Sequence, residues 1–240
     1  MPEPEGLPDA MGEERGKCAR AYGEADHTAR RRAWSIRNPG NAAARAELSE
    51  ALLEAAADPI AGGAHALDIG CGTGWLLEAL ARAGAQPGTL HGVELDRARA
   101  EAARARVPGA TIVHDDARAL GFGDGTFGVV FLIVVLSSLE PPGAQTALAE
   151  ARRVLSPGGM LLVYEPRLPN PFNPATHLVR RSHLDEAGLV PRAERSLTLL
   201  PQIGRRLGAL TPALHPRLSR VPVLRSHRLI TYRAPLSPTP

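Results

Sequence analysis

The sequence has little of several residue types, and each shortage removes a class of protein. Only two of its 240 residues are cysteines, which supports neither a disulfide framework nor a multi-cysteine zinc site. No stretch contains the roughly 20 consecutive apolar residues that a membrane-spanning helix requires. The first residues are acidic and polar, which argues against a secretory signal. We therefore expect a cytoplasmic protein.

Lysine is almost absent, and the other basic residues are unevenly placed. Lys17 is the only lysine, and residues 167–240 hold twelve arginines against three acidic residues. Before residue 167 the acidic residues outnumber the basic ones. A basic region of this kind can meet an acidic substrate, a nucleic acid or an anionic membrane surface, or it can be a solvated face. The charge alone leaves these alternatives open.

The length and the hydrophobic fraction of 44% fit one large domain better than two. Residues 38–41 interrupt an N-terminal helical pattern, and Asp58-Pro59 is expected to stop its second piece. We expect a disordered tail at 1–16, an N-terminal helical cap at 17–63, a ligand-binding core at 64–166, and a C-terminal part of the same domain at 167–240 with a basic helical insert at 201–225.

Short apolar runs alternate with helical stretches from residue 64 onward. This alternation predicts an α/β fold, a doubly wound and mostly parallel sheet with helices on both faces. Strands are expected at 64–69, 90–95, 111–114, 129–136, 160–165, 195–200 and 228–233, helices at 75–83, 97–106, 144–155 and 182–188, and a turn at 156–159.

A glycine loop follows the first of these strands. It reads Asp68-Ile69-Gly70-Cys71-Gly72-Thr73-Gly74 and opens a helix. Glycines let a backbone turn sharply and approach a ligand closely, and open sheets bind ligands at the carboxyl ends of their strands. A dinucleotide fingerprint needs a third glycine five residues after the first, where Trp75 stands. A nicotinamide oxidoreductase is therefore disfavoured.

Acidic residues follow the first three predicted strands. Asp68 precedes the glycine loop, Glu94 ends the second strand, and Asp115-Asp116-Ala117 follows the third. A carboxylate at the second position can accept both hydroxyls of a ribose. An acid after the third strand can accept the amino group of an adenine. These partners suit a ligand with a ribose, an adenine and an ammonium group better than they suit a pyrophosphate.

Five sequence elements in order resemble class I S-adenosylmethionine-dependent methyltransferases, especially the small-molecule group related to quinone-biosynthesis enzymes. The resemblance implies a Rossmann-like sheet with an antiparallel last strand. It also implies S-adenosyl-L-methionine as cofactor and S-adenosyl-L-homocysteine as product. No metal is expected, because no His/Asp cluster has metal-ligand spacing. The matching elements are residues 67–74, 92–95, 116–117, 120–127 and 153–159.

The resemblance also assigns roles by position. Two departures are Gly128, where the family usually has Asp, and Ser137-Ser138, where many relatives have a His pair that includes a candidate base. The cofactor-binding residues that the resemblance implies are Asp68 and Gly70 beside the methionine moiety, Cys71, Gly72 and Gly74 in the loop, Glu94 and Leu95 at the ribose, Asp116 and Ala117 at the adenine, Val135 near the sulfonium, and Tyr22 closing over the ligand.

The acceptor side is less defined. In the proline-rich loop after the fifth strand, Arg167, Asn170 and Asn173 are candidate substrate contacts or simply turn-forming residues. His177 and His183 are the candidate general bases. The insert at 201–225 carries leucines at helical spacing, which suits a lid, a membrane-surface helix or plain packing.

We therefore expect methyl transfer to a hydroxyl or carboxyl oxygen of a small molecule. An acidic or lipid-like acceptor would suit the basic, leucine-containing insert. Alignment of an already activated methyl group can supply much of the rate of such a displacement. The basic C-terminal region motivates an RNA- or protein-directed methyltransferase as the alternative. A nucleic-acid partner is less favoured, because no Asn/Asp-Pro-Pro-Tyr/Phe motif follows the fourth strand. Ser137-Ser138 motivates a non-catalytic cofactor-binding module. The oligomeric state is left open.

Overall fold

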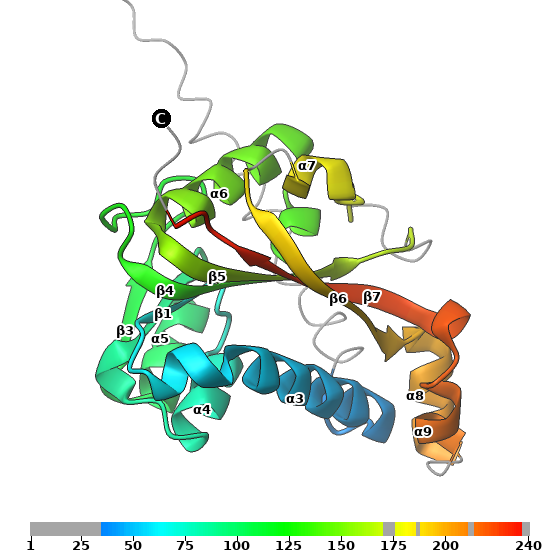
Figure 1. The fold of residues 1–240 in the computed structure, drawn as a ribbon. Coiled ribbons are helices and arrows are strands. Elements are labelled where there is room, and N and C mark those ends of the chain that lie inside the picture. The colour runs from blue at the N-terminus through cyan, green and yellow to red at the C-terminus, as the bar shows by residue number, and fades with distance from the viewer. Residues whose placement is uncertain (1–34, 170–175, 186–187, 211–213, 237–240) are drawn as a thin grey trace, which may run out of the picture. The chain divides into compact units, whose positions relative to one another are not determined.

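The computed structural model describes residues 35–169, 176–185, 188–210 and 214–236 (Figure 1). A seven-stranded sheet runs through the unit formed by residues 36–240. Its strands lie in the order β3-β2-β1-β4-β5-β7-β6, and β7 is antiparallel to both of its neighbours while the other pairs are parallel. The predicted mostly parallel sheet with an antiparallel last strand is confirmed. The strands are β1 (Ala66–Ile69), β2 (Leu90–Glu94), β3 (Thr111–His114), β4 (Phe127–Ile133), β5 (Leu155–Pro166), β6 (Val190–Leu199) and β7 (Arg225–Arg233).

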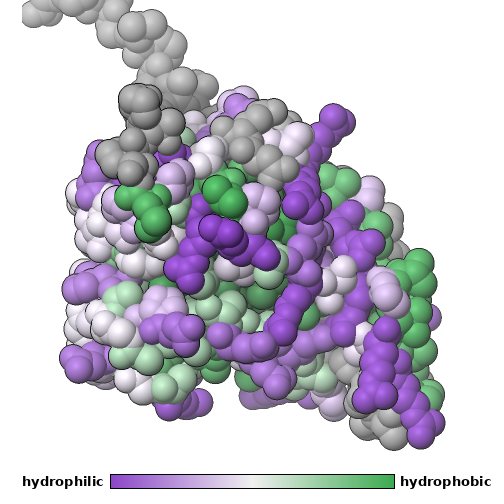
Figure 2. Space-filling model, viewed as in Figure 1, coloured by the Kyte–Doolittle hydropathy of each residue, from purple (hydrophilic) through white to green (hydrophobic). Residues whose placement is uncertain are grey.

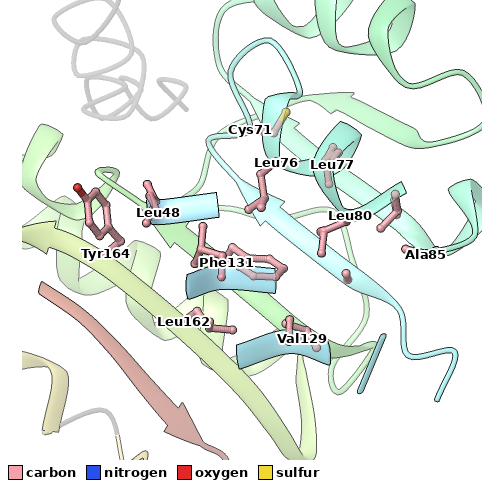
Figure 3. Packing of buried hydrophobic residues seen from close by; sticks show 14 of the residues in the cluster. Leu48, Cys71, Leu76, Leu77, Leu80, Ala85, Val129, Phe131, Leu162 and Tyr164 are labelled. Carbon is pink, nitrogen blue, oxygen red and sulfur yellow. The ribbon is translucent and has the colours of Figure 1, made fainter. Parts of the chain in front are cut away.

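Helices cover both faces of the sheet. On one face lie α3 (Pro39–Ala61), α4 (Trp75–Arg82) and α5 (Arg97–Arg106), and on the other lie α6 (Pro141–Val154) and α7 (Arg181–Asp185) (Figure 1). Successive residues of a strand point to opposite faces, and both faces of β4 are buried, which explains its unbroken apolar run. Figure 3 shows Phe131 and Leu162 of the sheet packed with Leu76 and Leu80 of α4.

Helix α3 begins where the sequence pattern is interrupted and ends later than predicted. The side chain of Asn38 caps it by accepting the backbone N–H of Gly40 at 2.9 Å, and Pro39 takes the first helical position. The expected stop at Asp58-Pro59 is wrong, because the helix continues to Ala61. A proline so close to the end removes only one helical hydrogen bond, which the packed helix tolerates.

Two boundaries near β4 and β5 also differ from the prediction. β4 ends at Ile133, three residues early, because Val134 adopts a φ of 57° and turns the chain into a short 3-10 helix, η2 (Leu136–Ser138). The turn expected at 156–159 lies inside β5. There the backbone N–H of Gly158 donates to the Pro235 carbonyl at 3.1 Å, which extends the pairing with the chain that follows β7.

Two further segments concern the starts of β2 and β6. The 3-10 helix η1 (Pro87–Thr89) leads into β2. β6 begins at Val190, five residues earlier than predicted, although Pro191 is its second residue. β6 lies at the edge of the sheet and pairs only with β7. Edge strands tolerate a proline, because one side of the strand has no neighbour that needs its N–H groups.

The basic insert forms α8 (Pro201–Leu210), α9 (His215–Leu218) and the 3-10 helix η4 (Pro222–Leu224). α8 packs closely on the start of α3, where a Cβ on Gly40 would lie 1.9 Å from the Gly204 carbonyl oxygen. Asn38 also donates from Nδ2 to the Arg205 carbonyl at 3.2 Å. Within the described residues, no helix is long and apolar enough to cross a membrane.

Candidate functional site

The glycine loop crosses the carboxyl ends of β1 and β2. Gly70 and Cys71 both donate their backbone N–H groups to the Val93 carbonyl, at 2.8 and 2.9 Å. Gly70 has a φ of +73°, and a Cβ there would lie 2.6 Å from Cγ2 of Val135. Only glycine meets both conditions without strain. The structure therefore brings the loop and Val135 together.

Asp68 is the next-to-last residue of β1, just before this loop, and is 2% exposed. Its Oδ1 has no hydrogen-bond partner among the described residues. Burial, and then the nearby Glu94, raise the pKa of Asp68 to about 8. A buried carboxyl oxygen without a partner is costly, and such groups concentrate at functional sites. A cationic ligand group beside Asp68 would relieve that cost.

Glu94, at the end of β2, supports the loop. Its Oε2 accepts the backbone N–H of Gly72 at 2.8 Å, and its Oε1 accepts that of Asp96 at 3.0 Å. Arg99 of α5 lies 3.6 Å from Oε1. A carboxylate offers about four acceptor positions, so each oxygen retains one for a ligand hydroxyl.

Asp116 follows β3, between the half-buried Ala117 and Asp115. Arg118 donates to Oδ1 from Nε at 3.0 Å and to Oδ2 from Nη2 at 2.8 Å, and both side chains are buried. Asp115 accepts the backbone N–H of Asp116. An adenine amino group would have to share the Asp116 carboxylate with this guanidinium.

The remaining loop residues take supporting places. Cys71 is buried, and burial followed by the charges of Asp68 and Glu94 raises the pKa of its thiol, so the side chain fills space and is no nucleophile. Gly74 has a left-handed φ of 77° at the start of α4. Leu95 is half-buried after β2.

Helix α3 contributes a cation that the sequence analysis missed. The guanidinium carbon of Arg45 lies 4.1 Å from the ring centroid of Trp75. Burial lowers the pKa of Arg45, while Tyr164 and Asp68 act in the opposite direction. An arginine in an N-terminal helix carries no local signal of this placement.

Ser137 lies in η2 shortly after β4 and is fully buried. Glu165 of β5 lies beneath it and accepts the backbone N–H groups of Leu136 at 2.8 Å and Ser137 at 3.3 Å. Burial raises the pKa of Glu165 to about 7, and hydrogen bonds from Ser137 and the neighbouring backbone oppose that shift. This buried carboxyl was not singled out from the sequence.

His177 lies on the α6 face of the sheet. Its backbone N–H donates to the Ser137 carbonyl at 2.8 Å, and its Nε2 is 3.4 Å from Oε1 of Glu140. It lines an apolar pocket of about 50 Å³ together with Leu139 and Leu184. Arg167 is exposed and donates to Oγ of Ser196 at 2.9 Å. Tyr22, Asn170, Asn173 and the side chain of His183 lie outside the described residues.

A second polar group gathers at the same edge of the sheet. We call Tyr164, Thr198, Ser226 and His227 the β5–β7 polar cluster. The hydroxyl of Tyr164 bonds to Oγ1 of Thr198, and the rings of Tyr164 and His227 stack with centroids 4.8 Å apart. Thr198 has a φ of 60°, a conformation that costs a residue other than glycine about 1–3 kcal/mol and that is typical of functional sites.

The hydrogen bonds of this cluster set the tautomer of His227. The Ser226 hydroxyl donates to the Thr198 carbonyl at 3.0 Å, so its oxygen accepts from Nδ1 of His227 at 2.8 Å. Nε2 is then the unprotonated nitrogen of the neutral ring. Burial lowers the pKa of His227 to about 4, so the imidazole is neutral near pH 7.

Helix α3 is tied to this cluster by Glu47. Its Oε2 accepts the backbone N–H of Thr198 at 2.9 Å, and its Oε1 pairs with Arg225 at the start of β7. No group of three or more metal-ligating side chains occurs in the described ranges.

Residues 66–159 match the family model described as a methyltransferase domain. The demethylmenaquinone methyltransferase of Staphylococcus aureus is 34% identical over 110 residues, which are 45% of this chain and 45% of that protein. The chain spans about half or less of the length of the first curated relatives that it matches.

Solved structures share the fold at low identity. The [4+2]-cyclase SpnF is 21% identical with a TM-score of 0.61, and the match covers 79% of this chain and 81% of that one. The geranyl diphosphate C-methyltransferase of Streptomyces coelicolor A3(2), solved with geranyl diphosphate and S-adenosyl-L-homocysteine, is 18% identical with a TM-score of 0.58 over 78% of this chain and 77% of that one. Residues 66–159 are therefore similar to methyltransferase domains, and the strand order of the sheet agrees with the Rossmann-like fold of these solved structures.

Proposed function

We propose that the protein binds S-adenosyl-L-methionine over the β1–α4 loop and transfers its methyl group to an oxygen of a small-molecule acceptor. The observation that carries this proposal is Asp68, a buried carboxyl with an unpartnered oxygen, next to a glycine loop supported by Glu94. The cofactor has an ammonium group for the first carboxylate and two ribose hydroxyls for the second. Asp116 and Ala117 are the proposed adenine neighbours.

The chain's own residues would mainly hold the cofactor and the acceptor in line, and would contribute less by removing a proton from the acceptor. When bound, the cofactor supplies a methyl group that its sulfonium already activates. The contact between Gly70 and Val135 sets how deeply the ligand sits at the sheet edge. An acceptor held in line with the methyl group needs little further assistance, since alignment removes much of the entropic barrier. The bonds from Glu165 to η2 hold this edge in place.

We propose that the β5–β7 polar cluster forms one side of the site that binds the methyl acceptor. Nε2 of His227 is a neutral hydrogen-bond acceptor, which suits a hydroxyl of the incoming molecule. His177 and His183 remain the alternative bases, and Arg167, Asn170 and Asn173 remain candidate acceptor contacts. Acidic and lipid-like acceptors have support from two relatives whose names specify demethylmenaquinone and geranyl diphosphate.

Calorimetric titration with S-adenosyl-L-methionine, S-adenosyl-L-homocysteine and NAD tests the cofactor. We expect saturable binding of both adenosyl ligands and none of NAD. Glu94→Ala removes hydrogen bonds to a charged group, worth about 1.5–3 kcal/mol, and should weaken binding by about 10- to 100-fold. Glu101→Ala is the matched control, because Glu101 is exposed on α5. Normal adenosyl binding by Glu94→Ala would contradict the proposed site.

A non-methylating use of the bound cofactor is the second candidate. It is favoured by the buried Ser137 where relatives often have a histidine. It predicts tight cofactor binding without loss of the methyl group across a panel of phenols, quinols, carboxylic acids and prenyl diphosphates. Incubation with methyl-labelled cofactor decides between the two, since any labelled acceptor product supports methyl transfer.

A further inference from the structure

An exposed apolar patch lies on the segment between β6 and β7. Val223 of η4 is 75% exposed, and Val221 and Leu214 are 38% and 37% exposed. Figure 2 shows hydrophobic side chains next to strongly hydrophilic ones over the region of α8 and α9. Large apolar side chains gathered on a surface mark an interaction site more often than isolated ones do.

Arginines accompany these apolar residues. Arg206, Arg217 and Arg220 are exposed, and none of the three forms an ion pair within the described ranges. By contrast, Arg195 of β6 pairs with Glu54 at 2.6 Å. Residues 201–225 contain no Asp or Glu. We call Leu214, Val221, Val223 and these three arginines the insert surface.

The insert surface stands at the edge of the sheet that holds the proposed site. The segment leaves β6 after Leu199 and returns at Arg225, where β7 enters the β5–β7 polar cluster. In a parallel sheet the carboxyl ends of the strands share one edge, so the glycine loop lies along the same edge. A partner seated on the insert surface would therefore lie along the same edge of the sheet as the glycine loop, with β4, β5 and β7 between β1 and β6.

We propose that the insert surface docks on the surface of an anionic lipid bilayer. The valines would enter the boundary between headgroups and acyl chains, and the arginines would pair with lipid phosphates. The short elements α8 and α9 suit a segment that lies on a membrane rather than one that crosses it. Nucleic acid is the weaker occupant, because residues 201–225 contain no Phe, Tyr or Trp to stack on bases.

Co-sedimentation with vesicles tests this proposal and needs neither cofactor nor acceptor, so its outcome is separate from that of the proposed function. Vesicles of equal parts phosphatidylcholine and phosphatidylglycerol should bind the wild-type protein, and pure phosphatidylcholine vesicles should bind it much less. Binding to the anionic vesicles should weaken as salt increases. Because each surface arginine contributes about fivefold, Arg217→Gln with Arg220→Gln should weaken binding by about 25-fold.

The apolar part is tested with a matched pair of variants. Val223→Asp should reduce vesicle binding by at least about tenfold, since it places a carboxylate among the headgroup phosphates. Leu236→Asp should leave binding unchanged. Leu236 is 86% exposed but lies beside Gly158, at the opposite edge of the sheet. Circular dichroism establishes that both variants are folded.

Three results would overturn the proposal. The first is binding of the wild-type protein to neither vesicle type. The second is equal vesicle binding by Val223→Asp and Leu236→Asp. The third is binding of a single-stranded RNA through the same arginines without any vesicle binding. Concentration-dependent dimerisation that Val223→Asp abolishes, without vesicle binding, would assign the surface to a second copy instead.

Discussion

Replacing Asp68 by asparagine should change how the free energy of unfolding depends on pH. In the folded protein the pKa of Asp68 is raised to about 8, whereas the same group in the unfolded chain titrates near 3.9. Between these values the folded protein holds a proton that the unfolded chain releases, so stability falls as pH rises through this window. One pKa unit corresponds to about 1.4 kcal/mol, so Asp68 alone should remove about 4 kcal/mol between pH 5 and pH 8.

Urea unfolding of the ligand-free wild type and Asp68→Asn at about pH 5, 6.5 and 8 measures this effect. The amide cannot ionise, so the difference between the two proteins isolates Asp68 from other shifted groups such as Glu165 and His227. We expect the free energy of unfolding of the variant to rise relative to that of the wild type by about 1.4 kcal/mol for each unit by which the pH is raised. A constant offset is expected too, because a buried amide left without partners costs about 1–3 kcal/mol.

Parallel stability curves for the two proteins would refute this reasoning, since they would mean that Asp68 ionises as easily in the fold as outside it. Cofactor binding gives an independent check. An ammonium beside Asp68 favours the carboxylate, so binding near pH 6.5 should release up to one proton in the wild type and none in Asp68→Asn. Calorimetry in two buffers of different ionisation enthalpy measures that proton.

Two further predictions concern packing and charge. Gly70→Ala and Gly63→Ala both place alanine at a positive φ, but only the alanine at position 70 would crowd a methyl group of Val135. Thermal denaturation should therefore show that Gly70→Ala is less stable than Gly63→Ala by about 1–3 kcal/mol. Equal losses would mean that the loop relaxes freely. A double-mutant cycle on the ion pair of Glu47 and Arg225 should give a coupling of about 1–3 kcal/mol. That coupling should persist in 1 M salt, because the pair is largely buried and weakly screened; its disappearance in salt would place the pair in solvent.

Several features of the site could be predicted from the sequence because their signals are local. Asp68, the glycine loop and Glu94 follow one another within one strand, its loop, the following helix and the next strand. The alternation of apolar runs and helical stretches similarly predicts a parallel sheet, whose carboxyl ends must share an edge. Boundaries were less predictable. Val134 ends β4 early by adopting a left-handed conformation, which the presence of a valine in a sequence does not indicate.

The β5–β7 polar cluster and its link to α3 depended on tertiary structure alone. Glu47 and Arg225 are 178 residues apart, and they meet because β7 inserts between β5 and β6. The same insertion stacks His227 on Tyr164 and fixes its tautomer through Ser226. Each of these residues stands in an ordinary strand or helix, so its sequence neighbours do not indicate which residues it will meet. Which polar groups share a site is decided by strand order, and strand order is a property of the packed sheet.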